Sequence, residues 1–481
     1  MRKHRAFDPS RRGFLRSLVG GSALYPGLVA RLLADEEAGS GSGSGNGPGP
    51  AASDPLAPRP PHFAPKARRV IFLYMSGGVS HVDSWDPKPR LFADHGRTVS
   101  VDEFQGRKGD FTMFAKRPQW DFRPHGQCGT EVSSLFPHLA ECVDDLCVIR
   151  SLTSDHTNHY EATLGIHTGS FTFARPSLGS WVSYGLGTVN RNLPSFVVIA
   201  PKTPYAGGQV WASDFLPGSH QGTLVVPGTE PVANLRRRVP EGSLQELELA
   251  AMARMNRDHL ASRAGDPMLS ARMRSFETAF GMQMELPDVF DLSRESDSTL
   301  ALYGLERGST QGFAWQCLVA RRLAERGVRF VELIDVGSSD NWDAHGDMLT
   351  HTPLARNVDQ AVAGLLRDLK QRGMLEDTLV VWTTEFGRTP FNAAADAKGR
   401  EHHHWVFSSW LAGAGVRPGT VHGESDDHGI RVARNGVHVH DFHATVLHLM
   451  GLDHERLTYR HTGRDFRLTD VAGEIVRGIL A

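Results

Sequence analysis

Histidine and aspartate residues occur in two pairs whose spacing suits metal binding. His81 and Asp83 follow one apolar run of the sequence, and Asp343 and His345 follow another. The members of each pair are separated by one residue, and in extended backbone the side chains of residues i and i+2 point to the same side. Each pair could therefore bind one cation with an imidazole and a carboxylate. Considered alone, each could equally be a hydrogen-bonded loop pair.

A second set of candidate ligands lies further along the chain. Glu385 ends an apolar run, and the adjacent residues His402 and His403 follow it. Glu385 could instead cap a helix, and the histidines could lie on the surface. Because side chains beyond the carboxyl ends of parallel strands meet at one edge of a sheet, we expect five residues to bind the same metal: Glu385, Asp343, His345, His402 and His403.

The chemistry of these side chains indicates which metal would bind. None of the four cysteines of the chain forms a Cys-x-x-Cys pair, which excludes a zinc ribbon. Imidazole and carboxylate ligands without thiolates suit zinc, manganese or iron, whereas calcium or magnesium is favoured only where carboxylates dominate. The sequence therefore predicts a divalent metal, with zinc favoured, and the predicted ligands are His81, Asp83, Asp343, His345, Glu385, His402 and His403.

Five nearly continuous apolar runs predict the strands that position these side chains: 69–75, 146–149, 196–199, 328–334 and 378–383. Such runs are typical of strands that are buried on both faces. Segments 315–326 and 354–373 carry apolar residues at the helical spacing of 3.6. Alternating strands and helices predict an α/β fold, with a mostly parallel sheet sandwiched by helices.

The chain divides by composition into three regions. Residues 1–35 contain Ser10-Arg-Arg-Gly-Phe-Leu15 before a short apolar run, which resembles a twin-arginine export signal rather than a basic cluster before a helix. Residues 36–66 are rich in Gly, Ser and Pro and predict a flexible linker, which serves as a tether or is simply an unstructured N-terminus. Residues 67–481 form one α/β domain, with an insertion at about 201–292.

Charge and hydropathy exclude several classes of protein. Lys and Arg number 52 and Asp and Glu number 54, so the formal net charge of −2 argues against a nucleic-acid partner or a polybasic membrane binder. The mature chain has no apolar run of the roughly 18 residues that a transmembrane helix needs. We expect a periplasmic or extracellular protein that the twin-arginine machinery exports, unless the signal stays uncleaved as an anchor.

Several motifs resemble a secreted bacterial family called domain of unknown function 1501. They are Phe72-Leu-Tyr-Met-Ser-Gly-Gly-Val-Ser-His-Val-Asp-Ser-Trp-Asp-Pro87, Ser154-Asp-His-Thr-Asn-His159, Trp342-Asp-Ala-His-Gly346, Glu385-Phe-Gly-Arg-Thr-Pro390 and Gly399-Arg-Glu-His-His403. That family is placed with the alkaline-phosphatase and sulfatase superfamily, whose members hydrolyse phosphate or sulfate esters on one or two metal ions. The resemblance implies an alkaline-phosphatase-like core with an insertion.

The resemblance also implies catalytic roles. The nucleophile of the superfamily normally lies at a helix N-terminus ahead of a Thr-Gly, and counting back from Thr168-Gly169 places His159 there, close to Thr157. Thr157 is then a hydroxyl nucleophile, and His159 is a general acid or a phosphoryl or sulfuryl acceptor, although it could also simply cap the helix. Arg388 or Arg400 would hold the remaining anionic oxygens.

Two functions follow from these observations. The first is an exported metal-dependent hydrolase that acts on an anionic phosphate or sulfate ester. The chain contains no Cys-x-Pro-Ser-Arg motif, so the formylglycine nucleophile of true sulfatases cannot form. The second is a catalytically degenerate member that binds sulfated or anionic polysaccharide without hydrolysing it. Metal analysis together with a panel of chromogenic esters distinguishes the two.

Overall fold

The computed structural model describes residues 54–235, 243–261 and 267–481. The chain divides into two compact units. The main unit consists of residues 55–235 and 274–481, and the second contains residues 236–273. The described part of the second unit comprises helix α8 (Ser243–Ala261) and the start of helix α9 (Pro267–Phe290), which continues into the main unit. The predicted export signal lies outside the described residues.

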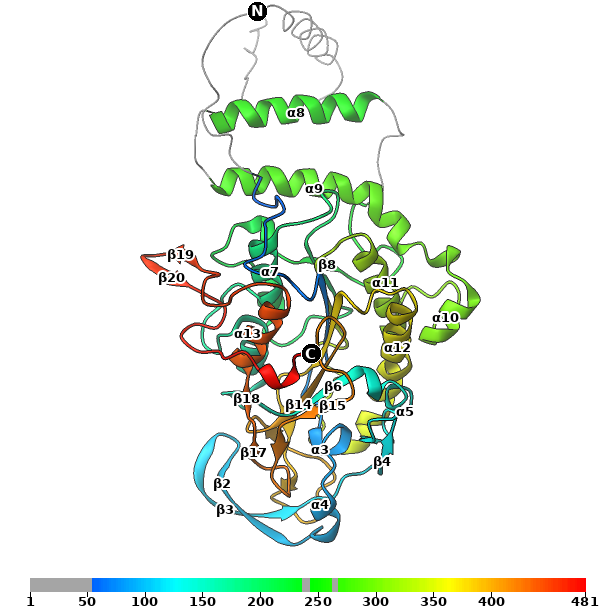
Figure 1. Ribbon diagram of the computed structural model, residues 1–481, viewed down its shortest axis with the longest axis vertical. Coiled ribbons are helices and arrows are strands. Elements are labelled where there is room, and N and C mark those ends of the chain that lie inside the picture. Colours follow the sequence, from blue (N-terminus) through cyan, green and yellow to red (C-terminus); the bar gives the residue numbers. More distant parts are fainter. Residues whose placement is uncertain (1–53, 236–242, 262–266) are drawn as a thin grey trace, which may run out of the picture. The chain divides into compact units, whose positions relative to one another are not determined.

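The main unit is built on a nine-stranded sheet in the described part of the chain (Figure 1). Its strand order is β15 (Thr420–His422), β6 (Leu146–Thr153), β14 (Phe407–Ala412), β10 (Thr378–Thr383), β1 (Arg69–Tyr74), β9 (Phe330–Ile334), β7 (Phe196–Ile199) and β8 (Thr223–Val225), and β18 (Val437–His438) also pairs with β6. All neighbours are parallel except that β14 is antiparallel to both β10 and β6. The predicted α/β fold with a mostly parallel sheet is confirmed.

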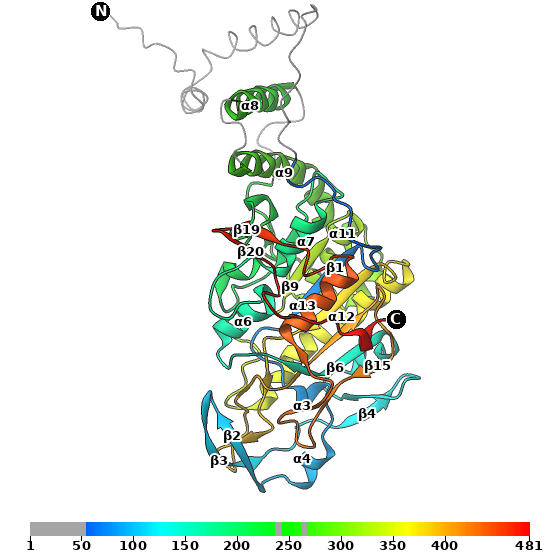
Figure 2. The same cartoon turned by 60° about the vertical axis from the view of Figure 1, so that its left-hand side comes forward.

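Helices cover both faces of this sheet (Figures 1 and 2). Ile71 and Leu73 of β1 pack in one core with α11 (Phe313–Glu325) and α12 (His351–Gln371). Val70 and Phe72 point to the other face, where α6 (His159–Thr168), α7 (Leu178–Leu186) and α13 (Val439–Leu449) pack. Because successive residues of a strand face opposite sides, a strand between two such layers must be apolar throughout.

The three central strands end at the same level. Tyr74, the last residue of β1, is opposite Thr383 of β10 and Ile334 of β9. The segments that follow these strands therefore leave the sheet at one edge, where ligands of parallel α/β sheets gather. This edge is where the sequence placed most of the candidate residues.

The structure corrects two predicted boundaries. Residues 55–66 are not a free linker, because Leu56 is buried and the backbone N–H groups of Arg59 and Lys66 donate to carbonyls of Leu186 and Leu449. The first part of the predicted insertion belongs to the main unit, because β8 is a strand of the central sheet. The composition of this segment, rich in Pro and Gly, predicted a flexible linker. That prediction was wrong for residues 55–66, because a few apolar side chains suffice to anchor such a segment.

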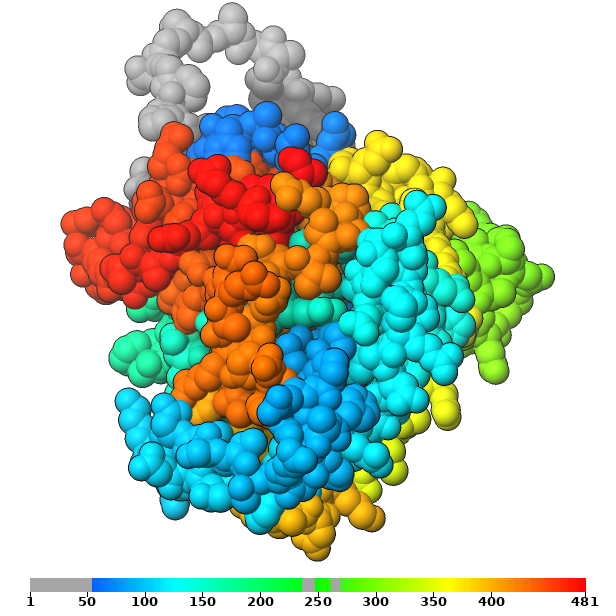
Figure 3. All heavy atoms as spheres, turned by 60° about the horizontal axis from the view of Figure 1, so that its bottom comes forward, coloured from blue at the N-terminus to red at the C-terminus, as the bar shows by residue number. Residues whose placement is uncertain are grey.

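Two smaller sheets lie beside the carboxyl edge of the central sheet. Strands β2 (Thr98–Phe104) and β3 (Arg107–Ala115) form a hairpin to which β12 (Phe391–Asn392) adds. Figure 3 shows this hairpin beside the segment around residues 400–435. Strand β11 (Gly387–Arg388) pairs antiparallel with β13 (His402–His403). No helix in the described part of the chain combines the length and apolar character needed to cross a membrane.

Candidate metal centre

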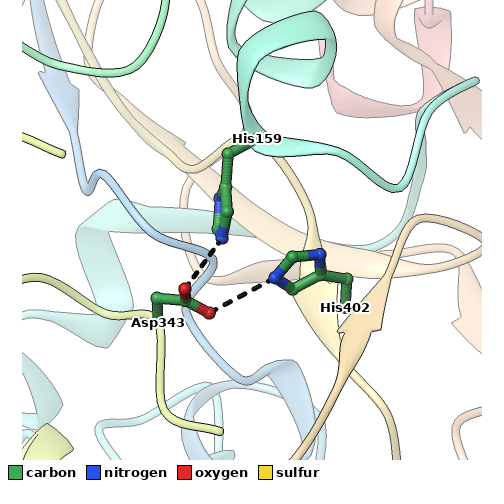
Figure 4. A group of neighbouring side chains, drawn as sticks. All are labelled: His159, Asp343 and His402. Atoms are coloured by element: carbon green, nitrogen blue, oxygen red, sulfur yellow. Dashed lines mark hydrogen bonds and ion pairs between the residues drawn. The ribbon is translucent and has the colours of Figure 1, made fainter. Parts of the chain in front are cut away.

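Three side chains from distant parts of the sequence converge at the carboxyl edge of the sheet (Figure 4). His159 is the first residue of α6, Asp343 lies in the loop after β9, and His402 lies on β13. Each offers one ligand atom, and the three atoms lie within 4.8 Å of one another. The Nε2 atom of His159 is 3.2 Å from Oδ2 of Asp343, and Nε2 of His402 is 3.3 Å from Oδ1.

Hydrogen bonds on the far side of the two imidazoles fix the direction of their lone pairs. Nδ1 of His159 is 2.7 Å from a carboxylate oxygen of Glu385, and Nδ1 of His402 is 2.7 Å from the carbonyl oxygen of Thr157. Both partners are acceptors, so each Nδ1 must carry the proton. Burial would lower the pKa of His159, but its contacts with Asp343 and Glu385 raise it above its usual value. When both rings are neutral, as metal binding requires, the Nε2 atom of each presents a lone pair toward Asp343.

A third imidazole adjoins this group. Nε2 of His345 is 2.9 Å from Oδ1 of Asp343 and 3.0 Å from Nε2 of His402. Its Nδ1 is 2.7 Å from a carboxylate oxygen of Glu401. His345 therefore lies between two carboxylates, and its side chain is 41% exposed, so it forms the open side of the centre.

Glu385 was predicted to bind the metal directly, but its carboxylate is engaged by Nδ1 of His159 and it lies behind the group formed by His159, Asp343 and His402. Its side chain is fully buried after β10, and besides His159 it accepts hydrogen bonds from the N–H of Gly77 at 2.8 Å and from the hydroxyl of Tyr74 at 2.9 Å. The hydroxyl of Thr384 donates to it at 3.1 Å. Burial alone would raise the pKa of Glu385, but the bond to His159 holds it below its usual value. Glu385 thus fixes the tautomer and orientation of His159, as carboxylates behind metal-bound histidines commonly do.

The electrostatics of the group favour a cation. Burial would raise the pKa of Asp343, but contacts with His159, His345, His402 and Arg388 hold it far below its usual range. Hydrogen bonds to Asp343 and Glu401 raise the pKa of His345 to about 9. The raised pKa of His159 and the lowered pKa of Asp343 show that the group attracts positive charge, which is carried either by protons on the imidazoles or by a cation between two neutral rings and the carboxylate. The donor set and its charge therefore fit a divalent metal.

The loop that carries Asp343 is fastened to the sheet by its neighbour Trp342. The backbone N–H of Trp342 donates to the carbonyl of Ser76 at 3.1 Å, and its indole N–H donates to the buried Asp335 at 2.9 Å. Burial raises the pKa of Asp335 to about 7. Gly77 has φ +113°, and a Cβ there would lie 2.6 Å from the backbone nitrogen of Trp342. Only glycine allows this approach without a shift of the loop.

The structure does not bring the predicted pair His81 and Asp83 to this group. These residues lie in the short helix α3 (His81–Ser84), not in extended backbone, so the spacing i, i+2 does not place them on one side. Asp83 instead pairs with Arg400 at 2.7 Å and accepts a hydrogen bond from Ser80. Nε2 of His81 is 2.9 Å from the carbonyl oxygen of Gly429.

The predicted pair His402 and His403 is also divided. Adjacent residues of a strand point to opposite faces, so only His402 faces Asp343. His403 is buried against His81, with the two rings stacked at 5.6 Å, and its Nε2 is 2.9 Å from the carbonyl oxygen of Ile430. The prediction that both histidines meet one metal overlooked this alternation.

The three residues predicted to be catalytic occupy different places. His159 lies at the helix N-terminus as expected, but both its ring nitrogens are directed at carboxylates. Thr157 offers its carbonyl to His402, and its hydroxyl lies beside the hairpin residue Gly106. Arg388 is fully buried, and its guanidinium donates to the carbonyls of Gly77 and Gly78 and to Asp343. Arg388 is thus committed to holding the loop and has no free face for substrate oxygens.

Several residues of the site carried no distinct sequence signal. Tyr205 stacks on His159 with ring centroids 4.2 Å apart and planes 7° apart, and its hydroxyl accepts a hydrogen bond from Asn341. Tyr74 is one apolar residue among several in its strand. Glu401 could have been noticed, because it directly precedes the histidine run.

The three consecutive histidines allow a direct test of this geometry. We expect His402→Ala to weaken metal binding by about tenfold or more, because a ligand is lost. His403→Ala should cost about 1–3 kcal/mol of stability with unchanged metal affinity, because its hydrogen bond and packing are structural. His404→Ala is the control and should change neither strongly. Calorimetric titration of the metal-free variants with zinc measures metal affinity, and their thermal unfolding measures stability. Equal losses of metal affinity in His402→Ala and His403→Ala would contradict the assignment.

Solved structures that match the chain include a sulfatase, a lipoteichoic acid synthase and an alkaline phosphatase. PsFucS1 sulfatase from Pseudoalteromonas sp. is 12% identical, with a TM-score of 0.36 over 86% of this chain and 72% of that chain. The lipoteichoic acid synthase LtaP from Listeria monocytogenes is 10% identical, with a TM-score of 0.35 over 89% and 81%. Alkaline phosphatase from the Antarctic bacterium TAB5 is 12% identical, with a TM-score of 0.34 over 81% and 99%. At these values the likeness carries no argument about chemistry.

Sequence comparison gives a firmer result. No curated protein matches the chain. A family described as "Protein of unknown function (DUF1501)" matches residues 67–480, which is nearly the whole of the chain that follows the predicted signal and linker. The chain therefore belongs to the DUF1501 family, as the motifs around His81, His159, Asp343, Glu385 and His402 suggested.

Proposed function

We propose that this protein is an exported, metal-dependent hydrolase of phosphate or sulfate esters. The observation that carries the proposal is the convergence of His159 and His402 on Asp343, with both Nδ1 atoms engaged elsewhere and both Nε2 atoms directed inward. Two imidazoles and one carboxylate leave further coordination positions open, as is usual for catalytic rather than structural zinc sites. Zinc is the metal that this donor set suits best.

In the proposed reaction, the metal would supply Lewis acidity that polarises the ester oxygen and activates water. His159, Asp343 and His402 would hold it, and Glu385 would keep Nε2 of His159 directed at it. Water replaces Thr157 as the proposed nucleophile, because the Thr157 hydroxyl is turned toward Gly106. We assign proton transfer to His345, which is partly exposed and bonded to Glu401. The tyrosine ring of Tyr205 covers one face of His159 and limits the access of water.

The proposal is tested by metal content and turnover measured on the same preparation. The purified protein should contain about one equivalent of zinc by mass spectrometry, and a chelator should remove both metal and activity. p-Nitrophenyl phosphate and p-nitrophenyl sulfate distinguish the two ester classes. Bound metal without turnover of either ester would contradict hydrolysis and favour the alternative of a protein that binds anionic polysaccharide.

We expect metal affinity to rise with pH up to about 9. The pKa of His345 is raised to about 9 in the metal-free protein, so its imidazolium opposes a cation at neutral pH. Metal binding should then release a proton below this pH, and the affinity should level off above it, because ligands and their neighbours must lose protons. Calorimetric titrations with zinc in buffers of different ionisation enthalpy measure the proton release directly. His345→Gln should abolish that part of the pH dependence, whereas a pH-independent affinity in the unaltered protein would contradict the account.

Export by the twin-arginine pathway remains part of the proposal. Arg11 and Arg12 lie outside the described residues, and the support is the sequence Ser10-Arg-Arg-Gly-Phe-Leu15. Replacing both with lysine should stop export and leave the folded protein in the cytoplasm. Cell fractionation measures this, and normal periplasmic levels of the double variant would exclude the pathway.

A further inference from the structure

A cavity of about 440 Å³ lies at the opposite edge of the central sheet from the metal centre. It opens at the amino ends of β1 and β9, where Arg69 begins the first strand and Arg329 precedes the second. The metal centre lies beyond the carboxyl ends of the same strands. Its volume falls in the range of about 300–1,000 Å³ that small-molecule sites occupy.

One part of the lining is strongly basic. Four arginines reach the cavity, at positions 59, 68, 69 and 329, against one carboxylate, that of Glu325. Glu325 is already bound by Arg321 at 2.8 Å and by Arg372 at 3.0 Å. Arg68 and Arg69 share Asp377. The balance of charge at the cavity is therefore positive.

Two of these guanidinium groups have no carboxylate partner in the described part of the chain. Arg59 donates to the carbonyls of Tyr184 at 2.7 Å and Pro55 at 3.4 Å, and Arg329 donates to the carbonyl of Gly187 at 2.9 Å. Burial alone lowers the pKa of Arg329, with no acidic group to offset it. Carbonyl contacts orient a guanidinium but do not neutralise it. Both groups are therefore available to pair with an anion in the cavity.

The rest of the lining is apolar. Its accessible apolar part is Val189, which is 58% exposed, together with the exposed Pro65 and the half-buried Pro61, whereas Leu186, Val328 and Met450 are already buried behind them. The prolines Pro61 and Pro65 line the same cavity. A ligand that contacts only the arginines would leave Val189, Pro61 and Pro65 in water, whereas a ligand with a hydrocarbon body would bury them.

We propose that this cavity binds one amphiphilic anion, with its acidic head group on Arg59 and Arg329 and its hydrocarbon body against Pro61, Pro65 and Val189. The ligand class is a single-chain molecule with one carboxylate, of the size of a medium-chain fatty acid. This site is separate from the metal centre and does not depend on the proposed hydrolysis.

Octanoate is the probe for this proposal, with octan-1-ol and acetate as matched comparators. Calorimetric titration of the full chain should show one saturable site for octanoate and binding at least about tenfold weaker for each comparator, since one lacks the charge and the other the hydrocarbon. Metal removal should leave the affinity unchanged. Absence of saturable octanoate binding, or equal binding of octan-1-ol, would overturn the proposal.

Substitutions locate the site. Arg59→Gln and Arg329→Gln should each weaken octanoate binding by about tenfold, because each removes a charge-assisted hydrogen bond. Arg460→Gln is the control, because Arg460 is an exposed arginine that pairs with Asp465 away from the cavity. Val189→Asp tests the rim independently, since Val189 is 58% exposed and a carboxylate there should repel the anion without disturbing the fold. Unchanged affinity in both Arg59→Gln and Val189→Asp would place octanoate elsewhere and overturn the proposal.

Discussion

Asp343→Asn is expected to abolish ester hydrolysis and to weaken metal binding by at least about a hundredfold. Among the described residues, Asp343 is the one that meets all three imidazoles, His159, His345 and His402. Changes in residues that merely support a ligand already cost about 10–100-fold in metal affinity. Removing the charge of Asp343 should weaken metal binding more than this, because Asp343 supplies the negative charge that attracts the cation to the two imidazoles.

Asp340→Asn is the matched control in the same loop. Asp340 is 84% exposed and pairs only with the half-exposed Lys202, so its loss should leave metal content and turnover unchanged. Zinc stoichiometry, turnover of both p-nitrophenyl esters and melting temperature should be measured on both variants. Full metal occupancy in Asp343→Asn would show that the three imidazoles converge for another reason and would remove the basis of the proposed function.

The fold was largely predictable because its strands are buried on both faces. The apolar runs that begin at Arg69, Phe196 and Thr378 match β1, β7 and β10 closely. Strand β14 was missed, although Phe407 to Ala412 is buried throughout, because two serines interrupt its apolar pattern. Serine hydroxyls are tolerated there when they find partners, and Ser409 bonds to Thr383 of β10 at 2.7 Å. The strand β14 is therefore stabilised by pairing with strands that are distant in the sequence, and its local apolar pattern does not reveal this pairing.

The site was predictable where sequence position alone fixes the location of a side chain. Asp343, His345 and Glu385 follow parallel strands, and the shared edge of those strands brings them together. The predictions failed where the local backbone conformation decides the direction in which a side chain points. His81 and Asp83 needed extended backbone but lie in a helix, and the alternation of β13 turns His403 away from Asp343.

The role of His159 could not be derived from spacing, because it depends on a contact across the fold. Only the structure shows that α6 places its first residue between Glu385, which follows β10, and Asp343, in the loop after β9. The resemblance placed His159 at a helix N-terminus correctly, but it suggested a nucleophile or an acid. A ring with both nitrogens directed at carboxylates is better suited to hold a cation than to attack an ester.

Glu385→Ala is expected to lower both metal affinity and stability. The substitution leaves the buried N–H of Gly77 and Nδ1 of His159 without their acceptor, and breaking this buried pair should cost about 3–5 kcal/mol. The hydroxyls of Tyr74 and Thr384 keep Thr163 and the carbonyl of Met75 as partners. It also frees Nδ1 of His159, so the ring is no longer held in the tautomer that directs its Nε2 lone pair inward. Metal affinity should then fall by about 10–100-fold.

Glu332→Ala separates these two effects. Glu332 lies on β9, which β1 separates from β10. It is buried like Glu385 and pairs with another histidine of α6, His167, at 2.8 Å. Its loss should cost a similar amount of stability, but His167 does not belong to the metal group, so metal affinity should be unchanged. Zinc titration and unfolding in the metal-free and metal-loaded states measure both terms, because a metal that binds only the native state adds stability by mass action. If both variants lost metal affinity equally, Glu385 would act only through the stability of the fold, and its assigned role in orienting His159 would be wrong.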